Sequence, residues 1–269
     1  MNRIIHRRSG FSLLQDILRI FDLNRVILTA LLVGGATIFG GGAGLIFRRT
    51  TKRFCDGVLS FAAGVMLAAA MLGLILPSIE YGGQFGAFTT VFGIFFGAGC
   101  VHLLDLMIPV ITRGRGSATA RGERARRVFL FVLAIALHNL PEGVAAGVGF
   151  GTGDTAGGIL IATAIALQNI PEGLIVTVAL LGVGIRPCLA FGISALTGVI
   201  EIVGTFMGYF AVSLSSALLP LILAMAGGTM LYVISEEMIP ETHSEESGRL
   251  PTYFLLIGFC LMLIFNALL

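Results

Sequence analysis

The stretch ALHNLPEGVAAGVG at residues 136–149 places a histidine, an asparagine, a proline and a glutamate inside an otherwise apolar run. A near copy, ALQNIPEGLIVTVA, follows at 166–179. A charged residue at the centre of an apolar helix is costly, and a proline there disturbs the helix, so a pattern that occurs twice indicates a functional reason. These two motifs, one per segment, are the main guide to both fold and function.

The composition of the whole chain explains the apolar surroundings of the motifs. Hydrophobic residues make up 56% of the 269 residues, charged residues 12%, and the mean hydropathy is +0.97. A soluble domain of this length is much less apolar. Several stretches reach the roughly 20 residues that a helix needs to cross a bilayer. The sequence therefore predicts an all-α polytopic membrane protein.

Eight transmembrane helices are expected, with short connections marked by Gly, Pro and polar residues. Their approximate bounds are 26–47, 57–79, 86–111, 128–150, 157–181, 188–212, 218–240 and 252–269. Residues 26–269 are expected to form a single transmembrane transport domain. Residues 1–25 are expected to form a basic N-terminal segment at the membrane interface, because the amphipathic stretch 11–22 is too short to span.

Lysine and arginine indicate the orientation of these helices. They occur in the loops after spans 1, 3, 5 and 7 and are absent from the loops after spans 2, 4 and 6. The richest is the loop at 112–127, which is expected to be cytoplasmic. Its arginines fit a topology determinant near anionic lipid, and no nucleic-acid partner is expected.

Three acids lie at the centres of successive spans: Glu142, Glu172 and Glu201. Each costs about 2.5–3.5 kcal/mol at the middle of a transmembrane helix. Spans 2 to 8 contain no Lys or Arg that could neutralise them. The carboxyl groups are therefore protonated, face water, or bind a cation.

The neighbours of these glutamates favour a cation. His138 and Glu142 are four residues apart and Asn139 and Glu142 are three apart, so the three side chains share one helix face. The second motif repeats this spacing at Gln168, Asn169 and Glu172. A mixed set of nitrogen and oxygen donors suits Zn, Fe, Mn or Cd better than Mg or Ca, which prefer oxygen alone.

The prolines fit the same interpretation. Pro141 and Pro171 remove a backbone donor and are expected to kink their helices, which is tolerated where the backbone lines a cavity. Two helices joined by a short loop run antiparallel, so a motif repeated across them implies a twofold axis in the membrane plane. Inverted repeats with disturbed helices at the midplane are typical of secondary transporters.

Weaker candidates lie along the other spans. Met66, in the middle of span 2, could supply a soft thioether ligand. Glu80 could attract cations at the entrance. Possible residues of an exit path toward the cytoplasm are His102, Asp105, Glu236, Glu237 and His243.

Four segments of the sequence resemble the ZIP family (Zrt/Irt-like proteins) of divalent-metal transporters, most closely its compact bacterial type. They are HNLPEG at 138–143, QNIPEG at 168–173, SFAAGVMLAAA at 60–70 and ISEEMIPETH at 234–243. The resemblance extends from about residue 26 to the end. It implies eight helices with both termini outside, import toward the cytoplasm, a bacterial cytoplasmic (inner) membrane, and a homodimer.

The resemblance also implies a binuclear metal centre between the fourth and fifth helices. One ion would be held by His138, Glu142, Gln168, Glu172, Glu201 and Met66. The second would be held by Asn139, Glu142, Asn169, Glu172 and Glu201, with bridging glutamates. Gln168 stands where the family commonly has a histidine, so zinc is expected with cadmium, iron or manganese as further substrates. The family also suggests an elevator-type movement of helices 1, 4, 5 and 6.

Two other functions use similar residues. The carboxylates could form a proton or monovalent-cation pathway, although a histidine and two asparagines suit a more demanding ion. An intramembrane metalloenzyme would use a metal to activate water, but HExxH and Ser/His or Asp/Asp arrangements are absent. We therefore expect a transporter and not an enzyme. The sequence shows no ATP-binding motif, and no organic cofactor is expected.

Overall fold

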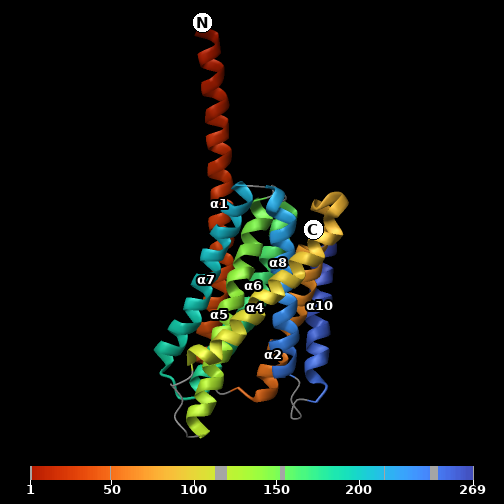
Figure 1. Ribbon diagram of the computed structural model, residues 1–269. Helices are drawn as coiled ribbons and strands as arrows, with labels where there is room; N and C mark the ends of the chain where they lie inside the picture. The colour runs from red at the N-terminus through yellow and green to blue at the C-terminus, as the bar shows by residue number, and fades with distance from the viewer. Residues whose placement is uncertain are drawn as a thin grey trace.

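The computed structural model describes residues 2–48, 50–112, 120–151, 155–214, 216–242 and 248–268. Within them the chain folds into a helical bundle (Figure 1). The long helices are α1 (Asn2–Ile46), α2 (Lys52–Ala69), α4 (Gly86–Thr112), α5 (Ala120–Gly151), α6 (Thr155–Gly182), α7 (Pro187–Leu214), α8 (Leu219–Val233) and α10 (Leu250–Leu268). Eight stretches of these residues are long and apolar enough to cross a membrane, which confirms the predicted all-α polytopic fold.

The second and seventh spans each contain a π-helical segment that the sequence does not predict. In the second, η1 (Ala70–Ile75) connects α2 to α3 (Leu76–Tyr81), and the short 3₁₀ turn η2 (Gly83–Phe85) follows. In the seventh, the 3₁₀ turn η3 (Ser216–Leu218) precedes α8, and η4 (Ile234–Met238) connects α8 to α9 (Ile239–Thr242). Wide π turns inside α-helices are frequent at functional sites. The η4 segment carries two of the predicted exit residues, Glu236 and Glu237.

Two helices begin earlier than the sequence indicates. Helix α1 is continuous from Asn2, and its N-terminal part projects beyond the bundle in Figure 1. The interfacial placement of residues 1–25 stays a prediction. Helix α5 begins at Ala120, so the predicted loop at 112–127 is helical in its second half. Its sequence there, ARGERARR, is rich in strong helix formers, which explains the earlier start.

Pro141 and Pro171 lie inside α5 and α6, each of which continues past its proline to the end of the span. Neither proline terminates its helix.

The helices divide into two groups by their closest backbone contacts. In the first group, α1, α5, α6 and α7 approach one another at glycines: Gly143 of α5 lies against the Glu201 carbonyl of α7, and Gly40 of α1 lies against the Ile170 carbonyl of α6. In the second group, Gly64 of α2 lies against α10, and α4 contacts α8 in the same way. A Cβ atom at these positions would strike the neighbouring backbone, so glycine permits the close packing.

Candidate metal centre

The two repeated motifs meet in the interior of the first helix group. His138, Asn139 and Glu142 come from α5, the corresponding three residues come from α6, and Glu201 comes from α7. All seven residues are at most 3% exposed. Burial of so many polar groups in a membrane protein requires that each finds a partner or a ligand.

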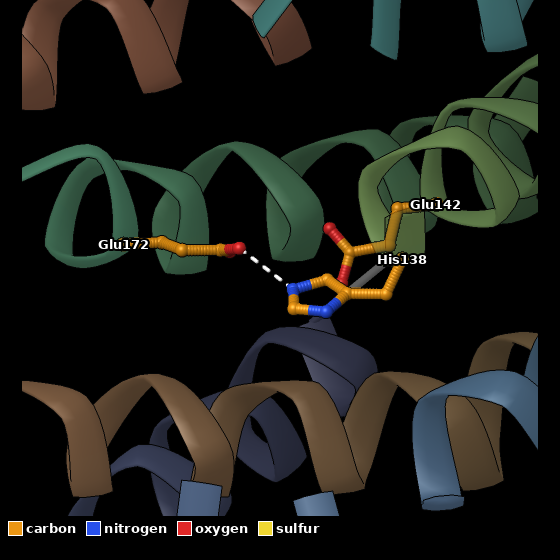
Figure 2. A group of neighbouring side chains, drawn as sticks. All are labelled: His138, Glu142 and Glu172. Atoms are coloured by element: carbon orange, nitrogen blue, oxygen red, sulfur yellow. Dashed lines mark hydrogen bonds and ion pairs between the residues drawn. The ribbon is translucent and has the colours of Figure 1, made fainter. Parts of the chain in front are cut away.

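The motifs are joined by two reciprocal contacts. His138 Nε2 lies 2.8 Å from Glu172 Oε1 (Figure 2). Gln168 Nε2 donates a hydrogen bond of 2.7 Å to Glu142 Oε1. The first residue of each motif therefore contacts the glutamate of the other. Since residue 138 faces 172 and residue 142 faces 168, α5 and α6 run antiparallel, as the inverted repeat predicts.

Glu201 lies between the two asparagines of the motifs. Asn139 Nδ2 donates to Oε1 of this carboxylate at 2.6 Å, and Asn169 Nδ2 donates to Oε2 at 2.7 Å. Asn169 Nδ2 also donates to the carbonyl oxygen of Val33 in α1 at 3.1 Å. The twofold relation of the motifs therefore extends to Glu201, whose two oxygens each receive one amide.

Thr37 of α1 is a third donor to Glu201, and the sequence analysis missed it. Its Oγ1 lies 2.9 Å from Oε1 and 3.0 Å from Oε2 of the carboxylate. The only signal in the sequence is a threonine before the glycine run of α1. That signal is weak, because a threonine in a helix commonly donates to its own backbone.

Each of the six motif side chains keeps one buried polar atom that has no hydrogen-bond partner. These atoms are His138 Nδ1, Asn139 Oδ1, Glu142 Oε2, Gln168 Oε1, Asn169 Oδ1 and Glu172 Oε2. All are lone-pair donors when His138 carries its proton on Nε2 toward Glu172. Unpaired buried acceptors are expensive, and a bound cation would satisfy them.

His138, Glu142 and Glu172 form the tightest part of this arrangement. One ligand atom from each lies within 4.8 Å of the other two. Figure 2 shows Glu172 pointing from its helix toward the imidazole, with Glu142 beside the same ring. One neutral imidazole and two carboxylates are a ligand set that suits a divalent transition metal.

Comparison with known proteins agrees with this chemistry. Residues 113–266 match the family described as ZIP Zinc transporter. The chain belongs to the ZIP family. It is 36% identical to the zinc transporter GufA of Myxococcus xanthus, over 89% of this chain and 97% of the relative. It is 37% identical to the zinc transporter ZIPB of Bordetella bronchiseptica, over 89% and 81%. Zinc transporter ZIP11 of Xenopus tropicalis is 32% identical, over 88% and 95%.

Membership of the ZIP family confirms the resemblance found in the sequence. The chain is an integral membrane protein whose family transports divalent metals. The relatives are named as transporters and not as enzymes, which agrees with the predicted function class.

The remaining predicted residues of this ZIP protein have no hydrogen bond to the central cluster among the described contacts. Met66 of α2 is fully buried in a hydrophobic cluster that includes Ala146 and Ile165. His102 of α4 is exposed, and its Nδ1 lies 2.9 Å from the hydroxyl of Tyr232 in α8. Glu80 is exposed at the end of α3.

Among the predicted exit residues, Glu237 is half-buried on η4. Glu236, its neighbour, is exposed. His243 and the side chain of Asp105 lie outside the part of the chain that the structure describes.

Proposed function

We propose that this ZIP protein carries Zn²⁺ toward the cytoplasm through the centre between α5 and α6. The observation that carries the proposal is the set of six buried atoms of the two motifs that have a lone pair and no hydrogen-bond partner. Zinc binds imidazole nitrogen and carboxylate oxygen, with four ligands in most sites. His138, Glu142 and Glu172 supply three such ligands, and Gln168 Oε1 is a candidate for the fourth.

A second ion would complete a binuclear centre. Its ligands would be the amide oxygens of Asn139 and Asn169 and the bridging carboxylates of Glu142, Glu172 and Glu201. Both amide oxygens are buried and unpartnered, which supports this position. Both oxygens of Glu201 already accept hydrogen bonds, so an ion would compete with these donors for the carboxylate.

The donor set also bears on which metals are carried. Gln168 offers a neutral amide oxygen where an imidazole would bind zinc more strongly, so Cd²⁺, Fe²⁺ and Mn²⁺ are proposed as further substrates. The thioether of Met66 is proposed as a soft ligand that would favour Cd²⁺. No organic cofactor is proposed.

The ion would enter past Glu80 and leave past Glu237. On the exit side, Glu236, His102, Asp105 and His243 would offer further ligands on the way to the cytoplasm. Transport requires that the centre bind the ion strongly enough to remove its water and weakly enough to release it. The carboxylates of the centre would bind the ion strongly enough to remove its water. Glu237 on η4 would offer a competing ligand and so favour release.

An elevator-type movement of α1, α5, α6 and α7 against the other helices would carry the centre across. The glycine contacts support this movement. Among the described glycines, an added Cβ would strike the backbone of another long helix only where both helices belong to the same group. Between the groups, Gly73 of η1 meets only the side chain of Ile161 in α6. Side-chain contacts can exchange partners more readily than interlocked backbones.

We further propose that the protein is a homodimer in a bacterial cytoplasmic membrane. The bacterial relatives GufA and ZIPB support the location. On α4, Phe88, Phe92 and Phe95 are exposed, which leaves an apolar surface for lipid or for a second copy.

Metal flux into proteoliposomes tests the proposed function. Purified protein would be reconstituted, and the entry of Zn²⁺, Cd²⁺, Fe²⁺, Mn²⁺ and Mg²⁺ would be followed with an internal fluorescent chelator or by metal analysis. We expect saturable entry of Zn²⁺, slower entry of the other transition metals and none of Mg²⁺. Flux no greater than that of empty liposomes, from protein that elutes as a folded species, would refute the proposal.

A further inference from the structure

The position of Thr37 depends on the close approach of α1 to α6 and α7. Gly40 of α1 lies against the Ile170 carbonyl, and Gly173 of α6 lies against the Thr37 carbonyl. Neither contact leaves space for a Cβ atom. Gly34 of α1 and Gly198 of α7 lie against each other's carbonyls in the same way. With α1 held against both helices, the fully buried Thr37 hydroxyl reaches the Glu201 carboxylate on α7.

Glu201 differs from the other two central glutamates in the number of its donors. Glu142 and Glu172 each keep one oxygen without a hydrogen-bond partner. Glu201 accepts from two amides and from the Thr37 hydroxyl, so each of its oxygens has a hydrogen-bond donor. Hydrogen bonds to a carboxylate are strong in a site without water, and a metal ion must compete with them.

We infer that Thr37 is a positioning residue that keeps Glu201 hydrogen-bonded and thereby limits how tightly the centre holds an ion. The inference rests on the proposed transport through this centre. The two amide donors belong to residues that are themselves proposed ligands, so they move when an ion binds. Thr37 is the donor that can hold Glu201 throughout, because its hydroxyl is not needed by the ion.

The consequence of removing this hydroxyl has a definite sign. Without it, Glu201 keeps its two amide donors, and the oxygen that accepted from the hydroxyl becomes more available to the ion. The ion is then bound more tightly and released more slowly. We expect Thr37→Val to lower KM for Zn²⁺ and to lower kcat by a similar factor. The factor is about tenfold, as expected for one hydrogen bond to a charged group.

The experiment compares matched variants of the full-length protein in proteoliposomes. Thr37→Val has nearly the size of threonine and lacks the hydroxyl, and Thr37→Ala is a second variant without it, in case valine prevents folding. Thr37→Ser keeps the hydroxyl and is expected to behave like the parent. Thr197→Val is the control for loss of a buried threonine, because its hydroxyl donates to the Ser194 carbonyl within α7. Zn²⁺ binding at equilibrium would be measured on the same preparations.

A joint fall of KM and kcat in Thr37→Val or Thr37→Ala, with tighter Zn²⁺ binding and parent values for Thr37→Ser and Thr197→Val, supports the inference. A structural defect would lower flux without tightening binding, and that result would overturn it. Unchanged KM and kcat in a folded variant without the hydroxyl would also overturn it. If the parent shows no saturable Zn²⁺ flux, the proposed function itself is refuted, and the variants are not needed for that conclusion.

Discussion

His138 Nε2 lies 2.8 Å from Glu172 Oε1, and this contact crosses between the two copies of one repeated motif. The equivalent contact in the other direction joins Gln168 to Glu142. The repeat is thus expressed in side-chain contacts as well as in the direction of the helices. Its one difference in functional groups is the exchange of an imidazole for a carboxamide, so we expect the two halves of the proposed centre to have unequal affinity for a transition metal.

The first prediction concerns this difference. Gln168→His would place a second imidazole beside Glu142, which is expected to lower KM for Zn²⁺ and to reduce the entry of Mn²⁺ relative to Zn²⁺. Imidazole is a stronger ligand for zinc than an amide oxygen, whereas Mn²⁺ prefers oxygen. Competition flux assays with both metals measure the change.

His138→Gln is the matched variant, because it removes the imidazole that the parent has. It is expected to raise KM for Zn²⁺ and to reduce the difference between the entry rates of Zn²⁺ and Mn²⁺. If both variants keep the parental ranking of metals, these positions do not determine selectivity.

The second prediction concerns packing within the first helix group. Gly143→Ala adds a Cβ that strikes the Glu201 carbonyl, so the helices must separate. Overpacking of this kind costs about 1–3 kcal/mol, and the thermal midpoint of the purified protein is expected to fall. The chain contains no tryptophan, so circular dichroism in detergent would be used to monitor thermal unfolding and obtain the midpoint.

Gly192→Ala in α7 is the control, because an added Cβ there has no neighbour within 4 Å. Alanine forms helices better than glycine by about 1 kcal/mol, so this midpoint should stay the same or rise. Equal destabilisation by both substitutions would show that the close contact is unimportant.

The third prediction concerns release of the ion. Glu237→Gln removes a half-buried acid from the proposed exit path, so kcat is expected to fall while KM changes little. The expected decrease is about twofold to fivefold, the size of a partly exposed charge interaction of up to about 1 kcal/mol. Glu236→Gln, at an exposed position on the same π-helical segment, should have a smaller effect. A larger effect at Glu236 would place the exit elsewhere.

Much of the fold follows from the sequence because apolar length alone defines a membrane span. The eight spans and the antiparallel pairing of the two motifs were predictable for this reason. The π-helical segments η1 and η4 were not, because an α and a π turn have the same composition. The early start of α5 was obscured by its charge, since arginine marks a membrane boundary but is also a good helix former.

The centre was predictable to the same degree. Glu142 and Glu172 stand out because a charge in an apolar helix is rare, and their neighbours follow from helical spacing. Thr37 and Asn139 both donate to Glu201, but they lie more than 100 positions apart in the sequence. No local pattern connects Thr37 to Glu201. Only the close packing of α1 on α6 and α7 reveals the contact.

The most direct test of the central claim is the Zn²⁺ flux of Glu172→Gln in proteoliposomes, compared with the parent. Glutamine keeps the size of the side chain and can accept a hydrogen bond from His138, but it removes a negative charge from the centre. We predict a loss of at least about tenfold in kcat/KM. Removal of one member of a buried charged set costs about 2–5 kcal/mol, and each 1.4 kcal/mol corresponds to about a factor of ten. Glu241→Gln, at an exposed position in α9, should keep parental flux. Parental flux from folded Glu172→Gln protein would contradict the account, because the ion would then cross by another route.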